Sequence, residues 1–326
     1  MLPNFSYVQA RDLREAVRLL EAEGARVHAG GTDLLGCLRD GVLGAQTVVS
    51  IAGIGELAGI REGVGGALRI GALTSVAAVA SNAVVRERYR ALAQAAESVG
   101  SPQLRNQGTI GGNLCQKPRC WYYRGEFDCL RKGGDKCFAV QGQNAGHCVL
   151  GGADCFMVHP SDTAPALVVF GASVKVDGPR GERSVPVEQF HVPPGKDPQR
   201  ETVLETGEVV TGIEIPAPPP GCRSSYRKVR TRRSWDFALA GVALAICVEN
   251  GRISRARLAL SGAAPIPWRS KEAEDVLTGA AVGSEIAQKA GMAAMKSARP
   301  LAKNGYKVHL FEGLIATEIQ KAFAEA

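Results

Sequence analysis

Six of the nine cysteines in this 326-residue chain lie in one segment that begins at Cys115 and ends at Asp162. Lysines, arginines and aromatic residues separate them. Cysteine ligates metal as the thiolate, and nearby positive charge lowers the cost of holding several thiolates in a partly desolvated site. The segment therefore predicts metal or redox chemistry, with free thiols and one zinc ion as the simpler alternative. Its cysteines are Cys115, Cys120, Cys129, Cys137, Cys148 and Cys155.

The composition narrows the class of protein and its partners. A length of 326 residues and a hydrophobic content of 45% are typical of a globular chain with two or three domains. Basic residues exceed acidic ones, 39 against 32, but they are scattered and form no stripe with aromatic residues, so we expect no nucleic acid partner. The apolar runs are too short to cross a membrane, so we expect no membrane partner.

The amino terminus and the cysteine distribution bear on the cellular compartment. The first residues lack a charged region followed by an apolar core, as a secretory signal would have. We therefore expect a cytoplasmic protein, and export of a folded complex on a partner's signal is the alternative. Cysteines concentrated in one segment of a large chain favour metal or redox chemistry over a disulfide scaffold.

Helical and strand patterns alternate along most of the chain. Residues 164–170 fit a helix or a buried strand, and the proline-rich residues 216–221 mark the best domain boundary. An Asn-Gly pair at 250–251 predicts a tight hairpin turn. The other predicted helices are 12–23, 34–39, 75–80, 84–99, 269–278, 284–297 and 309–324. The predicted strands are 26–29, 47–51, 68–73, 172–177, 181–187, 209–215, 225–230, 238–249 and 252–261.

Two glycine-rich stretches, residues 29–34 and 108–113, are the best candidates for ligand binding. Glycines let backbone N–H groups converge on a phosphate that no Cβ obstructs. Either stretch alone is more simply explained as a plain turn, but two of them in one domain predict a diphosphate ligand. The Rossmann fingerprint is missing, so a dinucleotide would have to be held by another fold.

Four motifs occur in order: the two glycine-rich stretches, His159-Pro160-Ser161-Asp162, and Tyr226-Arg227-Lys228 with Asp236-Phe237-Ala238. Together they resemble, nearly end to end, the FAD-binding medium subunit of the xanthine dehydrogenase family of molybdenum hydroxylases. The resemblance implies an α+β chain in two parts. Residues 1–221 form an FAD-binding domain of the p-cresol methylhydroxylase or vanillyl-alcohol oxidase type, and residues 222–326 form a C-terminal α/β domain like that of carbon monoxide dehydrogenase flavoproteins.

The same resemblance implies subdomains at 1–58 and 59–221, an insertion at 115–158, and a set of FAD contacts. The first glycine stretch binds the pyrophosphate, Asp162 accepts hydrogen bonds from ribityl hydroxyls, and Lys228 lends positive charge. Without the family, we would interpret Asp162 as a helix N-cap and Lys228 as a solvated strand end. The implied FAD contacts are Ala29, Gly30, Gly31, Thr32, Asp33, Leu34, Thr109, Gly111, Gly112, Asn113, Asp162 and Lys228.

The 48 residues between Asn113 and Asp162 resemble the loop of the 4-hydroxybenzoyl-CoA reductase and periplasmic aldehyde oxidoreductase branches, in which four cysteines bind an additional 4Fe-4S cluster. The implied ligands are Cys120, Cys129, Cys137 and Cys155. Cys115 is expected to be a packing residue near the flavin, and Cys148 is the main alternative to Cys155.

The spacings of the implied ligands, eight, seven and seventeen intervening residues, match no compact ferredoxin run. Four thiolates also suit tetrahedral zinc, but structural zinc sites usually contain close Cys-x-x-Cys pairs, and this segment has none. Zinc remains the alternative to the cluster, and the neighbouring flavin site favours the cluster.

The resemblance implies an electron-transfer subunit of an oxidoreductase, with no catalytic residue of its own. Substrate oxidation takes place at a molybdenum cofactor on a large partner, and 2Fe-2S centres on a small partner pass electrons to this FAD. The expected assembly is a heterotrimer or its dimer, with a ferredoxin-like or other external acceptor. Two rivals remain: a flavin oxidase that binds its own substrate, and a scaffold that has lost FAD.

Overall fold

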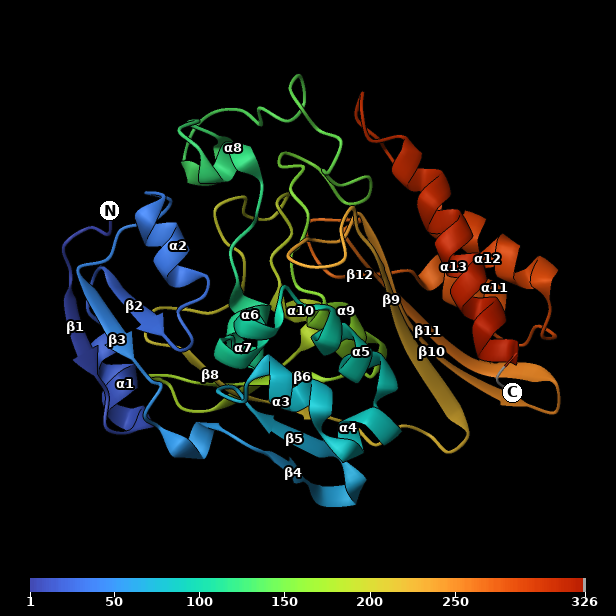
Figure 1. The fold of residues 1–326 in the computed structure, drawn as a ribbon, viewed down its shortest axis with the longest axis horizontal. Helices are drawn as coiled ribbons and strands as arrows, with labels where there is room; N and C mark the ends of the chain where they lie inside the picture. The colour runs from blue at the N-terminus through green and yellow to red at the C-terminus, as the bar shows by residue number, and fades with distance from the viewer. Residues whose placement is uncertain (325–326) are drawn as a thin grey trace.

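The structure, a computed structural model, describes residues 1–324 and arranges their strands in three sheets (Figure 1). The first is parallel, with the order β1-β3-β2. Helix α1 begins where Asp12 accepts a hydrogen bond from the Glu15 N–H at 2.8 Å. It buries Ala16 and Leu20, as the helical spacing predicts. This unit comprises β1 (Ser6–Gln9), α1 (Leu13–Leu20), β2 (Ala25–His28), α2 (Leu34–Arg39) and β3 (Thr47–Ser50).

The second sheet is antiparallel, with the order β4-β5-β8-β6-β7, so the late strand β8 lies between β5 and β6. Short helices pack against this sheet and share with it the largest of the three hydrophobic cores (Figure 1). The strands are β4 (Ile60–Glu62), β5 (Leu68–Gly71), β6 (Ser173–Asp177), β7 (Arg183–Pro186) and β8 (Val209–Ile215). The helices are α3 (Val76–Ser81), α4 (Ala83–Arg88), α5 (Arg90–Ser98), α6 (Pro102–Gln107), α7 (Ile110–Cys115), α9 (Thr163–Val169) and α10 (Val187–Phe190).

The predicted continuous helix over 84–99 is wrong, because the chain breaks at Tyr89 between α4 and α5. Tyr89 has φ −129° and ψ 47°, outside the helical region. Its side chain is fully buried against the ring of Phe170, and its hydroxyl donates to the Pro216 carbonyl at 3.2 Å. Burial of this one side chain therefore takes precedence over the helical pattern around it.

The third sheet is antiparallel, with the order β12-β11-β10-β9, and three helices cover one of its faces (Figure 1). Val242, Leu244 and Ile246 alternate along β10 and face those helices. The predicted turn is confirmed, with positive φ at Asn250 and Gly251. The elements are β9 (Cys222–Val229), β10 (Ala240–Glu249), β11 (Arg252–Ser261), β12 (Trp268–Arg269), α11 (Lys271–Leu277), α12 (Ser284–Met295) and α13 (Tyr306–Ala324).

Cys222 and Cys247 form a disulfide across β9 and β10, where they are direct partners in the register. The seven other cysteines are free. The sequence does not indicate this pair, because its members are 25 positions apart and only the sheet register brings them together.

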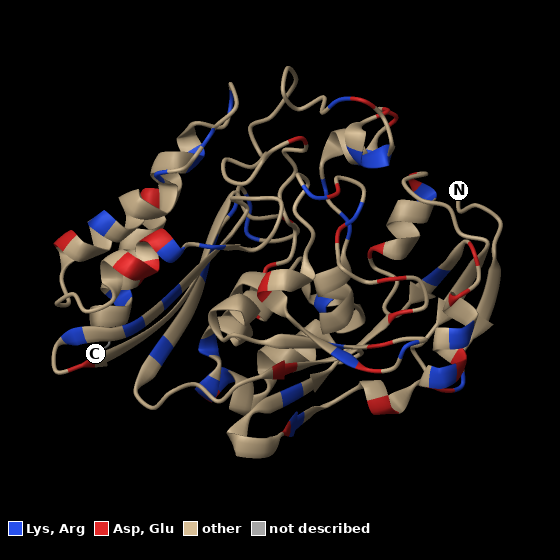
Figure 2. Cartoon of the chain, turned by 180° about the vertical axis from the view of Figure 1, so that it is seen from behind, with Lys and Arg blue, Asp and Glu red and all other residues tan. Residues whose placement is uncertain are grey.

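The cysteine-rich segment is largely irregular and lies above both larger sheets in Figure 1. It contains the single-turn helix α8 (Trp121–Arg124) and a 3-10 turn (Leu130–Lys132). Two further 3-10 turns, Gly55–Leu57 and Val64–Gly66, flank β4. Basic and acidic residues are interspersed over the rest of the fold (Figure 2). Within residues 1–324, no helix combines the length and apolar character needed to span a membrane.

Two methionines on α12 test the helical core of the third sheet. Met295 is 4% exposed and Met292 is 55% exposed. We expect Met295→Ala to lower the free energy of unfolding by about 2–5 kcal/mol, because it leaves a cavity. Met292→Ala, the matched control, should change it by less than about 0.5 kcal/mol. Chemical denaturation measures both, and equal losses would contradict this packing.

Candidate functional site

The two glycine-rich stretches lie side by side. The Gln107 side chain donates to the Gly30 carbonyl at 3.1 Å. A Cβ at position 30 would lie 2.0 Å from the Gln107 carbonyl oxygen, so only glycine allows this approach. Two stretches separated by more than seventy residues in the sequence therefore form one wall.

Cavities lie on both sides of this wall. One, of about 570 Å³, is lined by all of residues 29–34 and by Gly111. The other, of about 110 Å³, reaches Asp162 and Lys228. They share the lining residues Thr32, Asp33, Thr109, Gly112 and Gln116. All the implied FAD contacts therefore line one of two adjoining cavities.

The second glycine stretch is largely helical, since α7 begins within it. The hydroxyl of Thr109 caps this helix by accepting from the Gly112 N–H at 3.1 Å. Asn113 Oδ1 accepts from the Ser161 hydroxyl at 2.6 Å and from the Thr163 hydroxyl at 2.7 Å. The stretch is thereby tied to the Pro-Ser-Asp motif.

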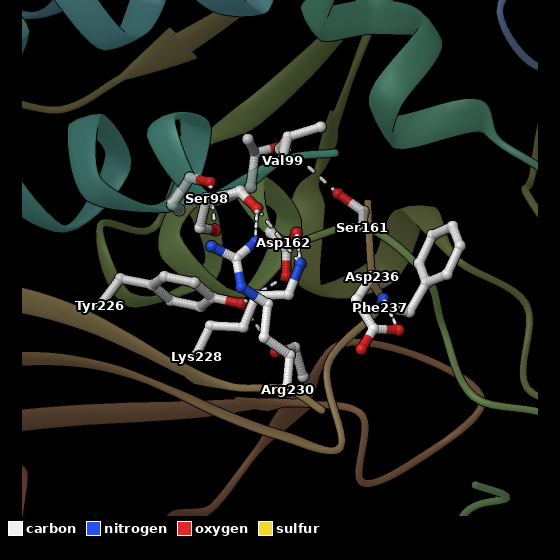
Figure 3. A network of polar contacts seen from close by, with 12 residues as sticks. Ser98, Val99, Ser161, Asp162, Tyr226, Lys228, Arg230, Asp236 and Phe237 are labelled. Atoms are coloured by element: carbon white, nitrogen blue, oxygen red, sulfur yellow. Dashed lines mark hydrogen bonds and ion pairs between the residues drawn. The ribbon is translucent and has the colours of Figure 1, made fainter. Parts of the chain in front are cut away.

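Asp162 forms a buried ion pair with Lys228 (Figure 3). The two side chains are 6% and 3% exposed, and Lys228 Nζ lies 2.7 Å from the carboxylate. Burial raises the pKa of Asp162, while the lysine and a hydrogen bond from the Tyr226 hydroxyl at 2.7 Å oppose that shift. Asp162 stands at the N-cap position of α9, but its side chain makes no cap hydrogen bond and pairs with Lys228 instead. Lys228 is buried, so its interpretation as a solvated strand end is wrong.

The carbonyl of Ser98, at the end of α5, accepts from two cations of β9 and the turn after it (Figure 3). These are Lys228 at 3.3 Å and Arg230 at 3.1 Å. Cations are favourable at a helix C-terminus. Tyr226, which also contacts the Ser261 hydroxyl at 2.9 Å, belongs to the same network and was missed as a site residue. The sequence did offer a clue to its role: Tyr226 lies two residues from Lys228, and residues two apart face the same side of a strand.

Asp33 anchors the cysteine-rich segment to the first glycine stretch. Its carboxylate accepts from the Lys117 backbone N–H at 2.7 Å and forms ion pairs with Arg119 at 2.7 Å and Arg124 at 2.8 Å. It makes no cap hydrogen bond to α2. The sequence analysis noted these arginines only as basic residues near thiolates and missed their structural partner.

Arg119 also connects the segment to residues 235–237. Its guanidinium lies 5.4 Å from the centre of the Phe237 ring. Trp235 and Phe237 are exposed and line the smaller cavity. The rim of that cavity therefore combines the cysteine-rich segment with the turn after β9.

Four cysteines interact within the segment. Cys137 and Cys155 are in hydrogen-bond contact, which lowers the pKa of Cys137 to about 6 and raises that of Cys155. Burial raises the pKa of Cys120 to about 11, and the nearby Cys137 and Cys129 add to this shift. Over residues 1–324, no three His, Cys, Asp or Glu side chains surround one point closely enough to hold a metal ion.

The two other cysteines of the segment occupy different surroundings. Cys115 lies in the wall of the larger cavity, and burial raises its pKa to about 12. Cys148 is fully buried; burial raises its pKa to about 12, and the nearby Cys137 contributes in the same direction. Its backbone carbonyl accepts from Asn304, just before α13, at 3.0 Å.

His147 is a further residue that the sequence analysis missed here. Its Nε2 lies 3.3 Å from the sulfur of Cys120, and its ring contacts Trp121. No histidine spacing in the sequence predicted this contact, because 27 residues separate the two.

Comparisons with known proteins agree with this fold. Residues 3–218 match the family described as the FAD binding domain in molybdopterin dehydrogenase, and residues 224–322 match the CO dehydrogenase flavoprotein C-terminal domain. The chain therefore belongs to the FAD-binding medium subunits of the molybdenum hydroxylase family, a class of oxidoreductase subunits. The predicted fold class, an FAD-binding domain followed by a CO dehydrogenase flavoprotein-like domain, is confirmed.

Curated relatives and solved structures match over nearly the whole chain. The aldehyde oxidoreductase FAD-binding subunit PaoB of Escherichia coli (strain K12) is 36% identical and covers 99% of both chains. The carbon monoxide dehydrogenase medium chain of Hydrogenophaga pseudoflava is 30% identical, over 91% of this chain and 88% of the relative. A solved carbon monoxide dehydrogenase structure from Hydrogenophaga pseudoflava has a TM-score of 0.79 at 28% identity and covers 99% of both chains.

The buried pair can be tested by a double-mutant cycle. Lys228→Met leaves the Asp162 carboxylate buried without its partner and should lower the free energy of unfolding by about 3–5 kcal/mol. Asp162→Asn in the same chain should recover part of that loss, because both charges are then absent. Lys175→Met, which removes one member of the exposed Lys175–Glu214 pair, is the control and should cost at most about 1 kcal/mol. Additive losses at 162 and 228 would show that the two charges are not coupled.

Proposed function

We propose that this chain is the FAD and 4Fe-4S electron-transfer subunit of a molybdenum-cofactor hydroxylase or dehydrogenase complex. It receives electrons from 2Fe-2S centres on a small partner after substrate oxidation on a large molybdenum-cofactor partner, and it delivers them to an external acceptor. FAD suits this junction because it exchanges electrons singly or in pairs. The names of the relatives, an aldehyde oxidoreductase subunit and a carbon monoxide dehydrogenase medium chain, support this class of complex.

The two adjoining cavities behind the glycine stretches are the observation that carries the FAD assignment. An extended dinucleotide would occupy both, with its diphosphate against the shared wall. At this wall glycine is required sterically at position 30, and a Cβ at Gly111 would lie 2.9 Å from that of Ala72. We assign the pyrophosphate to residues 29–34 and further contacts to Thr109, Gly111, Gly112 and Asn113.

The ion pair between Asp162 and Lys228 provides polar groups in the wall of the smaller cavity. Lys228 and the Asp162 carboxylate both line that cavity, so each can also face the cofactor. The carboxylate oxygens can accept hydrogen bonds from cofactor hydroxyls, and the ammonium contributes positive charge there.

For the iron-sulfur cluster we assign Cys120, Cys129, Cys137 and Cys155 as ligands. One zinc ion gathers its thiolates around a single point, whereas the four thiolates of a 4Fe-4S cubane bind four different irons and stand further apart. Within residues 1–324, the absence of a compact three-ligand group argues against a preformed site for one zinc ion. Both Cys155 and Cys148 lie near Cys137, and the resemblance of the loop assigns Cys155 as the fourth ligand.

The segment that carries these cysteines is fixed to the proposed FAD site at both ends. Asp33 holds its beginning through Arg119 and Arg124, and Asn113 holds its end through Ser161. A cluster in this segment would therefore lie near the flavin. In the proposed heterotrimer, or its dimer, such a cluster offers a further one-electron exit towards a ferredoxin-like acceptor.

Spectroscopy of the complex purified anaerobically with its partners tests the proposal. We expect flavin bands over a broad shoulder that dithionite bleaches, and about four irons and four labile sulfides per FAD beyond those of the partner's 2Fe-2S centres. Zinc in place of these additional irons and sulfides would contradict the cluster. A chain without flavin would contradict the FAD assignment, and substrate turnover by the isolated chain would contradict the electron-transfer role.

The fourth ligand is tested by a matched pair of substitutions. Cys155→Ser should lose the cluster iron, whereas Cys148→Ser should retain it, although both cysteines are buried in the same segment. Iron and labile sulfide analysis of the two purified variants, with FAD content as the folding control, measures the difference. Retained iron in Cys155→Ser together with lost iron in Cys148→Ser would exchange the two assignments.

A further inference from the structure

Two buried basic side chains have no role in the FAD site: His147, which belongs to the cysteine-rich segment, and Lys307 of α13, which contacts that segment. His147 is 4% exposed, and its Nε2 lies 3.3 Å from the sulfur of Cys120. Trp121 and Tyr122 hold the ring, with centres 5.5 and 5.9 Å away. Its second nitrogen, Nδ1, is buried without a hydrogen-bond partner. At Nε2, the partner of this imidazole is therefore a cysteine sulfur.

The proton on the ring follows from the state of the cysteine. Nε2 is the ring nitrogen that lies within hydrogen-bond distance of the sulfur, at 3.3 Å. A ligating Cys120 is a thiolate, which only accepts hydrogen bonds. The N–H must then lie on Nε2 and point at the sulfur.

Lys307 brings a full positive charge to the same region. Its side chain is completely buried, and Nζ donates to the carbonyls of Gly146 at 3.4 Å, His147 at 3.1 Å and Gly262 at 2.5 Å. No carboxylate within residues 1–324 pairs with it. Burial lowers its pKa to about 8, so it still carries a proton near pH 7. A buried ammonium is costly without a counter-charge, and the anionic groups that a cluster would create nearby are cysteine thiolates.

The start of α13 fixes both groups in place. Asn304 donates to the carbonyls of His147 at 3.1 Å and Cys148 at 3.0 Å, and the Lys303 N–H donates to the Asn144 side chain at 2.9 Å. Figure 1 shows this end of α13 beside the cysteine-rich segment. The C-terminal domain thus holds the segment's second half, as Asp33 holds its first.

We infer that His147 and Lys307 are positioning residues for the proposed 4Fe-4S cluster, and that together they raise its reduction potential. The inference rests on the cluster assignment made above. An electron added to the cluster increases the negative charge on its sulfurs. An N–H donor and a buried cation beside those sulfurs stabilise that reduced state more than the oxidised one.

The experiment measures the midpoint potential of the cluster by redox titration of the anaerobically purified complex. His147→Phe keeps a ring between the aromatic neighbours but removes the donor, and Lys307→Met keeps the apolar stem but removes the charge. Both should shift the potential to lower values, and His147→Gln and Lys307→Arg should restore part of it. Lys303→Met is the matched control: it removes an exposed lysine four residues away, leaves the backbone contact of that residue, and should leave the potential unchanged.

The outcomes separate this inference from the cluster assignment. A wild-type complex whose iron and labile sulfide are fully accounted for by the partner's 2Fe-2S centres overturns the cluster, and this inference with it. A cluster whose potential is the same in wild type, His147→Phe and Lys307→Met overturns this inference alone. Because His147→Phe leaves the backbone contacts of α13 intact, it decides the question even if Lys307→Met does not fold.

Discussion

The buried ion pair between Asp162 and Lys228 is the interaction on which the site depends. Asp162 precedes α9 in the core of the second sheet, and Lys228 lies on β9 of the third sheet. Burying either charge without the other would cost free energy, because an unpaired ion in a low-dielectric interior loses its hydration. The pair, with the Tyr226 hydroxyl, therefore fixes the third sheet against α5 and α9 and sets the position of the smaller cavity.

A second set of polar contacts gives the cysteine-rich segment its shape. The segment has little regular structure, so its backbone groups need partners elsewhere. Asp33 supplies one at its start, and Asn304 with Lys307 supply others along its second half. At its end, Asn113 accepts from the Ser161 side-chain hydroxyl. Elements from three parts of the chain thus converge on the cysteines. An insertion held in this way can keep buried thiols close together without a helix or sheet of its own.

Regular elements and local motifs could be predicted well from the sequence. The apolar spacing in α1, the alternation along β10 and the Asn250-Gly251 turn depend on neighbours a few residues apart, and each is confirmed. The break at Tyr89 could not be predicted, because its cause is a contact with the distant Phe170 and Pro216. The Cys222–Cys247 disulfide was missed for the same kind of reason, since strand register alone makes these residues opposite.

The sequence by itself determined the family, the glycine stretches and the concentration of cysteines, because these are properties of residue identity and local order. Only the tertiary structure decided which charges meet. It paired Asp162 with Lys228, where the sequence left a helix cap and a solvated lysine as alternatives. It also showed that Asp33 forms ion pairs with the arginines of the cysteine-rich segment. It also brought His147 to Cys120 and Lys307 into the interior. Such contacts join residues far apart in the chain, and burial makes their charges consequential, so no local pattern encodes them.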